Sequence, residues 1–340
     1  MAMRDACLEV SPPIAADAAL AAGAALRSQL GPALPVALYA APLTGEAVVA
    51  GAYQRTQDAL SAHALSSGSA LRRATGGVTV RAGDGIGYLA LALEDASTLM
   101  RCPPRAILNR NVRGVLQGLR AAGAETNYFG RDYLAFGVLP GVYVAWARDE
   151  QGRMLLEFFI GIERDFRVDD ADCAYPEPPE PPFRGRTPTC LTAVHGRSFA
   201  FEEVVAAIAD THAQQFGLRF GEPTSPSAPD DEALRGRKLR IREDELSWSS
   251  PQPEAIGFVS AGVAVDDAGA IADARLAGDF MLSEATEQTL AERARGLPAD
   301  DAPLVGLVNG LYTNDAHFIE GVKDTGSILR VLRDALAAAR

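Results

Sequence analysis

The stretch Leu71–Gly77 reads LRRATGG and is the densest cluster of glycine and basic residues in the chain. Two glycines after a threonine let the backbone approach a ligand closely, and exposed amides beside Arg72 or Arg73 suit a phosphate or a carboxylate. The stretch matches neither the P-loop nor the dinucleotide-binding pattern. An ordinary glycine turn is the alternative interpretation, so the segments around the stretch have to decide its meaning.

Those segments follow one another in an informative order. A strand ending in Gly51-Ala52-Tyr53-Gln54 precedes LRRATGG, and GDGIGY (83–88) and FGRDYLAFG (129–137) come after it. This succession resembles the lipoate-protein ligases and octanoyltransferases, with their Gly-x-x-Gln strand end, Arg-Arg-x-Thr-Gly-Gly loop and Gly-Arg-Asn-Asp element. AIADARLAGDF (270–280) is similar to the Gly-Asp-Phe hairpin of the ligases' accessory domain. The resemblance covers about residues 35 to 335.

The resemblance implies an α+β fold with two domains. The larger is a biotin/lipoate-ligase-like catalytic domain, a mixed sheet packed with helices, expected over residues 1–222. The proline-rich, acidic stretch 221–231 (GEPTSPSAPDD) separates two segments that each look complete, so a linker is placed at 223–236. A small α+β accessory-like domain is then expected over residues 237–340.

Apolar periodicity predicts the individual elements. Helices are expected at 15–30, 56–65, 110–122, 199–216, 284–295 and 327–339; strands are expected at 36–43, 47–53, 77–81, 86–93, 133–136, 142–147, 154–162, 255–265 and 270–276. The strands within 133–162 form a predicted meander. The turn Asp266-Asp267-Ala268-Gly269 predicts a hairpin in the last hundred residues.

The resemblance also assigns site residues. Arg73, Thr75, Gly76 and Gly77 are expected to wrap the acyl chain and the acyl-adenylate. Tyr88 is expected near the acyl pocket, and Arg131 and Asp132 beside the nucleotide. The alternative for Arg131 and Asp132 is a strand-edge turn with a local ion pair, which stabilises a protein little.

One departure from the family pattern concerns charge. The family has a Gly-Arg-Lys-Ile-x-Gly segment whose lysine contacts the acyl carbonyl and the phosphate, whereas this chain has Leu139 at the lysine position. A leucine cannot stabilise a developing oxyanion, and loss of one such group costs roughly 10² to 10³ in rate. Residues 1–237 contain no lysine, so Arg148 and Arg153 are the candidate replacements.

Further departures point to altered chemistry. Val78 replaces the third glycine of the loop, Arg81-Ala82 stands where a histidine is usual, and Glu157–Gly161 replaces a His-Gly-Thr segment. Relatives that form thioesters use a cysteine, so Cys190 is considered beside His195, against the alternative of an inert buried thiol. The segment around Cys190 also resembles a strand of the ligases.

The implied reaction is activation of a lipoyl or medium-chain acyl group by ATP, with Mg²⁺ accompanying the nucleotide, and transfer to an amine. A lipoyl-domain carrier protein is the implied partner. Two alternatives stay open because of Leu139. One is a diverged acyltransferase that forms an amide on a small molecule; the other is a non-catalytic descendant that binds an acylated carrier protein.

Composition excludes several classes of protein. A formal charge of -12 disfavours binding to nucleic acid, because the polyanion would be repelled. No apolar run approaches the roughly 20 residues of a membrane span, and charges near the start argue against a secretory signal, so a cytoplasmic protein is expected. The four cysteines contain no CxxC pair and the histidines no convincing ligand set, so no metal is assigned.

Overall fold

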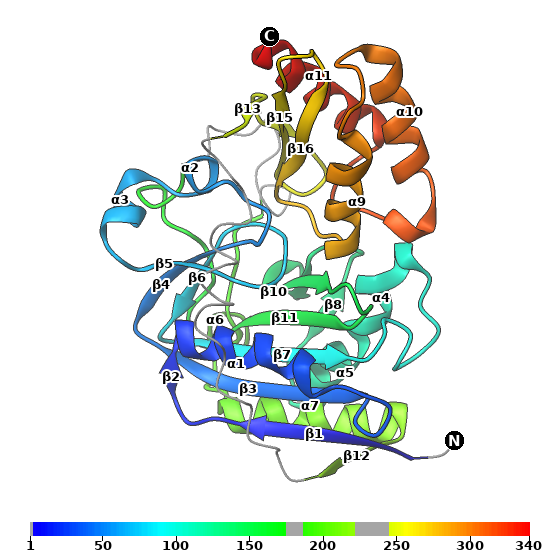
Figure 1. Cartoon of the computed structure of the whole chain (residues 1–340). Helices are drawn as coiled ribbons and strands as arrows, with labels where there is room; N and C mark the ends of the chain where they lie inside the picture. Colours follow the sequence, from blue (N-terminus) through cyan, green and yellow to red (C-terminus); the bar gives the residue numbers. More distant parts are fainter. Residues whose placement is uncertain (1–2, 175–185, 222–244) are drawn as a thin grey trace.

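The computed structural model describes residues 3–174, 186–221 and 245–340 (Figure 1). The predicted linker at 223–236 and the proline-rich stretch at 175–182 lie outside these residues. Within the described chain, no helix is both long and apolar enough to cross a membrane.

A mixed sheet organises the first two thirds of the chain. Its strands are β1 (Arg4–Val10), β2 (Ile14–Ala15), β3 (Val36–Thr44), β7 (Ile86–Leu93), β8 (Thr126–Tyr128), β9 (Tyr133–Phe136), β10 (Leu139–Arg148), β11 (Met154–Gly161) and β12 (Leu218–Gly221). The order is β12-β1-β3-β7-β11-β10-β9-β8, with β2 beside β3. β1 runs parallel to β3 and β12, whereas the other neighbours along this path are antiparallel. The predicted meander at 133–162 is therefore confirmed.

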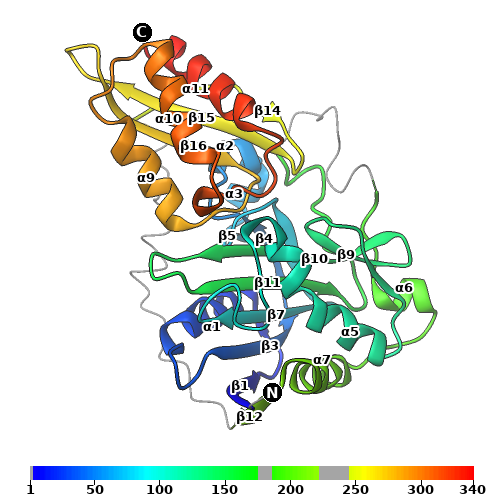
Figure 2. The ribbon, with the colours of Figure 1, turned by 90° about the vertical axis from the view of Figure 1, so that its right-hand side faces the viewer.

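Helices cover both faces of this sheet (Figure 2). They are α1 (Ala16–Gln29), η1 (Pro104–Ala106), α4 (Ile107–Asn111), α5 (Arg113–Ala121), α6 (Leu191–His195) and α7 (Phe201–Phe216). A Cβ on Gly23 of α1 would lie 2.1 Å from the Tyr88 hydroxyl, and a Cβ on Gly87 would lie 2.4 Å from the Phe201 ring. Because successive strand residues point to opposite faces, α1 and α7 lie on opposite sides of β7.

A second, three-stranded sheet presents the LRRATGG stretch. It has the order β5-β4-β6 and consists of β4 (Glu46–Ala50), β5 (Ala70–Arg72) and β6 (Val80–Gly83), with α2 (Thr56–Ala59) and α3 (Ala62–Ser66) between β4 and β5. The prediction of a single helix at 56–65 was wrong, because two short helices, α2 and α3, occupy this segment. Leu60 is extended and buried, and the Ser61 hydroxyl accepts from the Ala64 amide to start a new helix.

The C-terminal part has its own sheet and helices. The elements are β13 (Ser247–Trp248), β14 (Gln252–Pro253), β15 (Phe258–Val265), β16 (Ile271–Gly278), α9 (Glu284–Ala294), α10 (Asp301–Tyr312), η3 (Asp315–His317) and α11 (Thr325–Ala339). The β15–β16 hairpin and the two predicted helices are confirmed. The sequence reading missed α10, whose apolar residues are interrupted by Gly306 and Gly310.

Two local predictions were wrong in the helix-covered part of the chain. The helix predicted at 110–122 is divided into α4 and α5 at Val112. The segment around Cys190, compared with a family strand, instead begins α6, which ends at Gly196 in the left-handed region (φ 64°). Glycine adopts that conformation without steric cost, so it terminates the helix.

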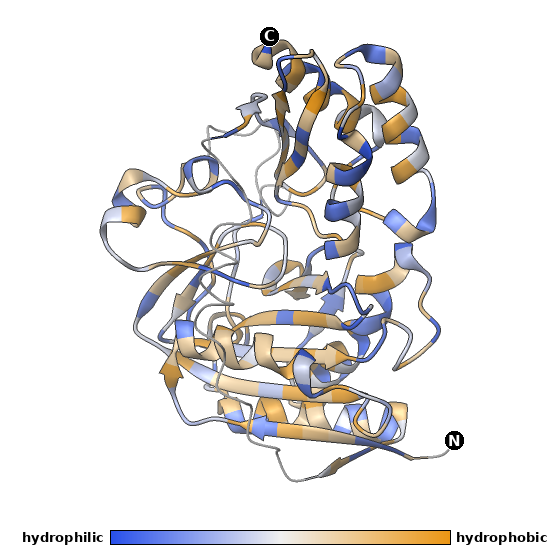
Figure 3. Ribbon diagram, viewed as in Figure 1, coloured by the Kyte–Doolittle hydropathy of each residue, from blue (hydrophilic) through white to orange (hydrophobic). Residues whose placement is uncertain are grey.

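Two apolar cores are joined by a few residues. Figure 3 shows apolar residues concentrated along the strands of the large sheet. Met281 and Ile256 come from the C-terminal part but belong to the core of the large sheet, and Tyr53 comes from the N-terminal part but belongs to the C-terminal core. Arg27 on α1 also forms a buried ion pair with Glu284 on α9, at 3.5 Å. The two parts are therefore packed together.

Candidate functional site

The side chain of Arg73 is the internal support of the glycine loop (Thr75–Gly77). It is 1% exposed, and its guanidinium donates hydrogen bonds to the carbonyls of Gly76 and Val78 and of Val49 on β4, at 2.5 to 3.1 Å. It also lies 3.1 Å from the Tyr143 hydroxyl on β10. These bonds satisfy most of its donors, so Arg73 holds the loop rather than presenting a cation to a ligand.

Arg72 is occupied in a similar way. Its Nη1 donates to the carbonyls of Gly51 and Gln54 at 2.7 and 2.6 Å, and its Nη2 donates to Thr56 at 3.0 Å. Arg72 therefore fastens β5 to the segment that follows β4. Both arginines of the LRRATGG stretch therefore donate their hydrogen bonds to oxygen atoms of the protein itself.

Thr75 and Tyr88 meet at a carboxylate that the sequence reading did not assign. Glu157 on β11 is fully buried; it accepts from the Thr75 amide (3.1 Å), the Thr75 hydroxyl (2.5 Å) and the Tyr88 hydroxyl (2.7 Å). Its neighbours across β7 and β10 are Ala90 and Ala145, which leave the carboxylate accessible to the loop. In the sequence, Glu157 stood out only as part of the segment that replaces the His-Gly-Thr segment of the family.

The two glycines of the loop are required by close contacts. A Cβ on Gly76 would lie 2.2 Å from the Phe280 carbonyl oxygen, and a Cβ on Gly77 would lie 1.9 Å from the Tyr143 hydroxyl. Gly77 also has a φ of 87°, which other residues rarely adopt. The glycines therefore allow the loop to pack between the sheet and the C-terminal hairpin.

The C-terminal hairpin binds the loop region through its backbone and two side chains. The Gly77 amide donates to the Phe280 carbonyl at 2.9 Å, and the Gly278 amide donates to the Tyr53 carbonyl at 2.9 Å. The Tyr53 and Phe280 rings stack with centroids 5.3 Å apart. The Met281 sulfur accepts from the Trp146 amide of β10 at 3.2 Å. The glycine loop is thus covered by Gly278–Leu282.

Gln54 links two of the sequence motifs directly. Its amide oxygen accepts from the Gly51 amide (2.6 Å) and the Thr79 hydroxyl (3.0 Å), while its Nε2 donates to the Asp279 carboxylate. Asp279 also accepts from the Phe258 amide at 2.9 Å. The Gly-x-x-Gln strand end and the Gly-Asp-Phe hairpin, far apart in sequence, therefore contact one another.

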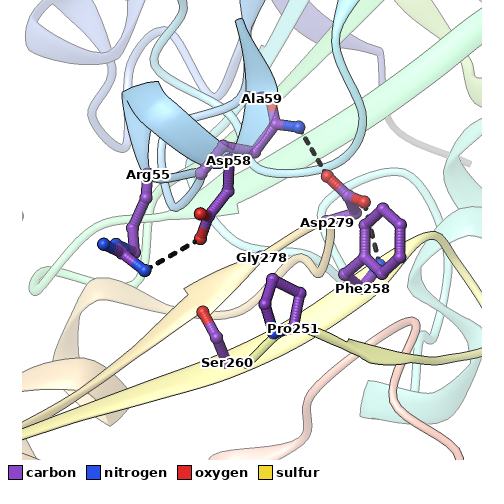
Figure 4. A pocket seen from close by; sticks show the side chains of 9 residues that line it. Arg55, Asp58, Ala59, Pro251, Phe258, Ser260, Gly278 and Asp279 are labelled. Carbon is purple, nitrogen blue, oxygen red and sulfur yellow. Dashed lines mark hydrogen bonds and ion pairs between the residues drawn. The ribbon is translucent and has the colours of Figure 1, made fainter. Parts of the chain in front are cut away.

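A small cavity lies beside this contact (Figure 4). Its volume is about 10 Å³, which is about the space that one water molecule needs. Its lining comes from α2 with its flanking residues and from the C-terminal sheet: Gln54, Arg55, Asp58, Ala59, Pro251, Phe258, Ser260, Gly278 and Asp279. Such a cavity is too small for an acyl group.

Arg131 and Asp132 lie together at the boundary with the C-terminal part. Asp132 is 1% exposed, and its Oδ1 lies 3.7 Å from the Arg131 Nε; neither atom has a hydrogen-bond partner within the described part of the chain. Arg131 donates to the Ala255 carbonyl at 2.8 Å. Burial raises the pKa of the Asp132 carboxyl, and the Arg131 guanidinium partly opposes that rise.

Glu320 adds a second carboxyl to this cluster. Its backbone pairs with Met281 through hydrogen bonds of 3.0 and 2.8 Å. Burial, and then the nearby Asp132 carboxyl, raise the pKa of Glu320 from 4.5 to about 7. Burial is the main cause that raises the pKa of the Tyr128 hydroxyl, and the carboxyls of Glu320 and Asp132 raise it further. The cluster is dominated by acidic groups, which is unfavourable for binding phosphates.

Leu139 is not buried. It begins β10 and is 38% exposed, and its neighbour Val138 is 62% exposed. The two candidate replacements for the lysine are occupied at the other end of β10–β11: Arg148 pairs with Asp95 at 3.1 Å, and Arg153 pairs with Asp149 at 2.8 Å.

Cys190 precedes α6 and His195 is its last residue, and the two do not form a nucleophile–base pair. Cys190 is 6% exposed and precedes the helix, and the His195 ring packs on Phe136 and Phe199 with centroids 6.4 and 5.5 Å away. No hydrogen bond joins them among the described residues. Throughout the described residues, no group of three or more His, Cys, Asp or Glu side chains could hold a metal ion.

Comparison with solved structures identifies the fold. LipL1 of P. falciparum, solved in complex with lipoate, matches 96% of this chain and 98% of its own with a TM-score of 0.68 at 12% identity. The lipoate-protein ligase of a bi-partite system from Thermoplasma acidophilum matches 72% of this chain and 95% of its own (TM-score 0.55, 17% identity). This chain has the lipoate-protein ligase fold.

Other comparisons agree with that assignment or find nothing. A lipoate-protein ligase A bound with ATP matches 72% of this chain and 98% of its own, with a TM-score of 0.52 at 16% identity. No protein-family model and no curated protein sequence matches. The lipoate-protein ligase fold is therefore retained here at very low sequence identity, and the predicted α+β class is confirmed.

Proposed function

We propose that this protein binds a lipoyl or medium-chain acyl group that is already joined to a carrier, and that it does not activate the free acid with ATP. The observation that carries the proposal is the buried carboxylate of Glu157, held by Thr75 and Tyr88 directly under the glycine loop.

The charge of the ligand follows from this carboxylate. A free fatty acid or lipoate is an anion and would be repelled by a buried carboxylate in a region of low dielectric. An amide or a thioester of the same acid is neutral and avoids that repulsion. The donors of Arg72 and Arg73 bind backbone and hydroxyl oxygens of the protein, so neither guanidinium is placed to bind the carboxylate of a free acid.

A triphosphate fits the described residues poorly. Beside the expected nucleotide position, the carboxyls of Asp132 and Glu320 accompany a single guanidinium, that of Arg131, which already donates to Ala255. Leu139 offers no charge. ATP and Mg²⁺ therefore have no role in the proposed function, which takes an acylated carrier, such as a lipoyl-domain protein, as its partner.

The fold supports this proposal at a coarser level. Solved neighbours include a ligase bound with lipoic acid and a ligase described together with its E2 lipoyl domain. Those ligands belong to the neighbouring proteins. For this chain they suggest the class of ligand, an acyl group of lipoyl size, and the class of partner.

Calorimetry with octanamide and octanoate tests the charge argument. Octanamide is expected to bind at least tenfold more tightly than octanoate, and Glu157→Gln is expected to reduce that difference. Glu163→Gln, an exposed carboxylate nearby in the chain, is the matched control and should leave the difference unchanged.

Two enzymatic assays complete the test. Pyrophosphate release from ATP with lipoate or octanoate would overturn the proposal in favour of a ligase. Amide formation from an octanoyl thioester and a small amine would overturn it in favour of an acyltransferase. Equal binding of octanoate and octanamide would contradict the assigned role of Glu157.

A further inference from the structure

A surface groove lies on the side of the large sheet that is remote from the glycine loop. Its volume is about 370 Å³, and it runs between α4–α5 and the edge strand β8. We call it the arginine groove; its lining consists of Asn109, Val112, Arg113, Leu116, Gln117, Arg120, Asn127, Tyr128, Phe129 and Gln215.

The placement of α5 separates this groove from the proposed acyl site. A Cβ on Gly118 of α5 would lie 2.4 Å from the Ile208 Cα of α7, so these helices are in close contact. The Phe201 ring of α7 lies against Gly87, whereas the adjacent Tyr88 points to the loop side of the sheet. The two sites are therefore on opposite faces.

The charge of the groove is opposite to that of the protein. The chain carries a formal charge of -12, yet among the residues that the structure describes the groove lining contains two arginines and no carboxylate. Arg113 donates to Asn109 and Arg120 donates to Thr126 and Asn127, which holds both guanidinium groups in place in the groove lining. Each guanidinium has further donors, so both can still bind an anionic group.

The spacing of the two arginines favours a chain over a small ion. Arg113 and Arg120 are seven residues apart on α5, which corresponds to about 10.5 Å along a helix that rises 1.5 Å per residue. Two carboxylates at a similar spacing can each bind one of the two guanidinium groups. A polyproline II segment advances about 3.1 Å per residue and presents every third side chain on one side, so its carboxylates recur every 9 Å or so.

Apolar surface extends the groove at one end. Phe129 is 50% exposed and Leu116 is partly exposed. The Arg186 guanidinium lies over the Phe129 ring, 5.8 Å from its centroid, and donates to the Val138 carbonyl at 2.6 Å. The exposed residues Val138 and Leu139 continue this surface. Aromatic and apolar side chains beside cations are typical of surfaces that bind extended peptides.

We infer that the arginine groove docks an extended acidic segment of a partner protein. Carboxylates three residues apart bind Arg113 and Arg120, and the residues between them pack on Leu116 and Phe129. The inference is independent of the acyl ligand, because the groove and the glycine loop use different residues.

A fluorescein-labelled peptide, Glu-Pro-Leu-Glu-Pro-Leu-Glu, tests the inference by fluorescence anisotropy with the full chain. The peptide should bind, its binding should weaken as salt is raised, and the glutamine version of the peptide should bind at least tenfold more weakly. The double variant Arg113→Glu/Arg120→Glu should lower the affinity at least tenfold. The matched control is Arg295→Glu/Arg330→Glu, which makes the same charge change at exposed positions elsewhere.

Three results would overturn the inference. These are equal binding of the glutamate and glutamine peptides, equal loss of affinity in both double variants, and displacement of the peptide by inorganic phosphate at peptide-like concentrations, which would indicate a small-anion site. If the double variant does not fold, Arg113→Gln and Phe129→Ala carry the test. Each should weaken binding several-fold with an unchanged thermal melting curve.

Discussion

The backbone amide of Gly77 donates a hydrogen bond to the carbonyl oxygen of Phe280 at 2.9 Å, and this bond joins the glycine loop to the C-terminal hairpin. The two residues are about 200 positions apart in sequence. The contact places backbone, rather than solvent, against the side of the loop that faces away from the sheet.

Gly76→Ala is expected to weaken this contact. The added Cβ would lie 2.2 Å from the Phe280 carbonyl oxygen, so the hairpin has to shift, at a cost of about 1–3 kcal/mol for overpacking. Thermal melting should show the loss, and limited proteolysis should cut faster near the hairpin. The control is Gly306→Ala on α10, where a Cβ meets nothing within 4 Å; it should leave stability unchanged or raise it by up to about 1 kcal/mol.

Tyr88→Phe removes one donor from the buried Glu157 carboxylate. A hydrogen bond to a charged group contributes about 1.5–3 kcal/mol, so the variant should melt several degrees lower. Tyr312→Phe is the matched control, since the Tyr312 hydroxyl is buried and forms no hydrogen bond to any residue that the structure describes. A similar loss in both variants would show that removal of any buried hydroxyl lowers stability and that the bond to Glu157 adds nothing.

Leu139→Lys introduces the lysine that the sequence resemblance predicts at this position, and we expect it to produce no pyrophosphate release with ATP and lipoate. Leu139 lies at an exposed strand start, and Glu157 still occupies the space under the loop. Val138→Lys, at the more exposed neighbouring position, controls for the added charge. Adenylation in Leu139→Lys alone would mean that the site needs only a lysine.

Stability should fall as the pH rises between about 4.5 and 7 because of Glu320. Its pKa in the folded protein is about 7, above 4.5, so the folded state holds the proton that the unfolded state has already lost. The contribution of Glu320 to the free energy of unfolding is at most about 3 kcal/mol. It is fully present below pH 4.5 and is lost as the pH rises through about 7. Glu320→Gln should flatten this part of the profile of melting temperature against pH. An unchanged slope would contradict the assignment.

Much of the fold could be predicted from the sequence. The continuous apolar runs of β7 and β11 and the pattern of the β15–β16 hairpin are local properties, because each can be recognised without reference to the neighbouring strands. Helix ends were harder to predict. The break at Leu60 depends on burial of that side chain, which is a tertiary contact.

The candidate site was predicted only in part. The LRRATGG loop was singled out in the sequence as a ligand-binding element, and the structure places it between the large sheet and the C-terminal hairpin. Its arginines were expected to face a ligand, but their exposure depends on where β4 and β10 place carbonyl and hydroxyl oxygens. Their expected roles at an acyl-adenylate remain a prediction.

The sequence by itself determined most of the strands and helices and the place where two glycines let the backbone approach another group closely, since these follow from periodicity and backbone freedom. Only the tertiary structure decided which charges meet. It brought Glu157 beneath Thr75 and Tyr88 and set Asp279 against Gln54. Electrostatic partners depend on distance in space, and a linear sequence does not specify that distance.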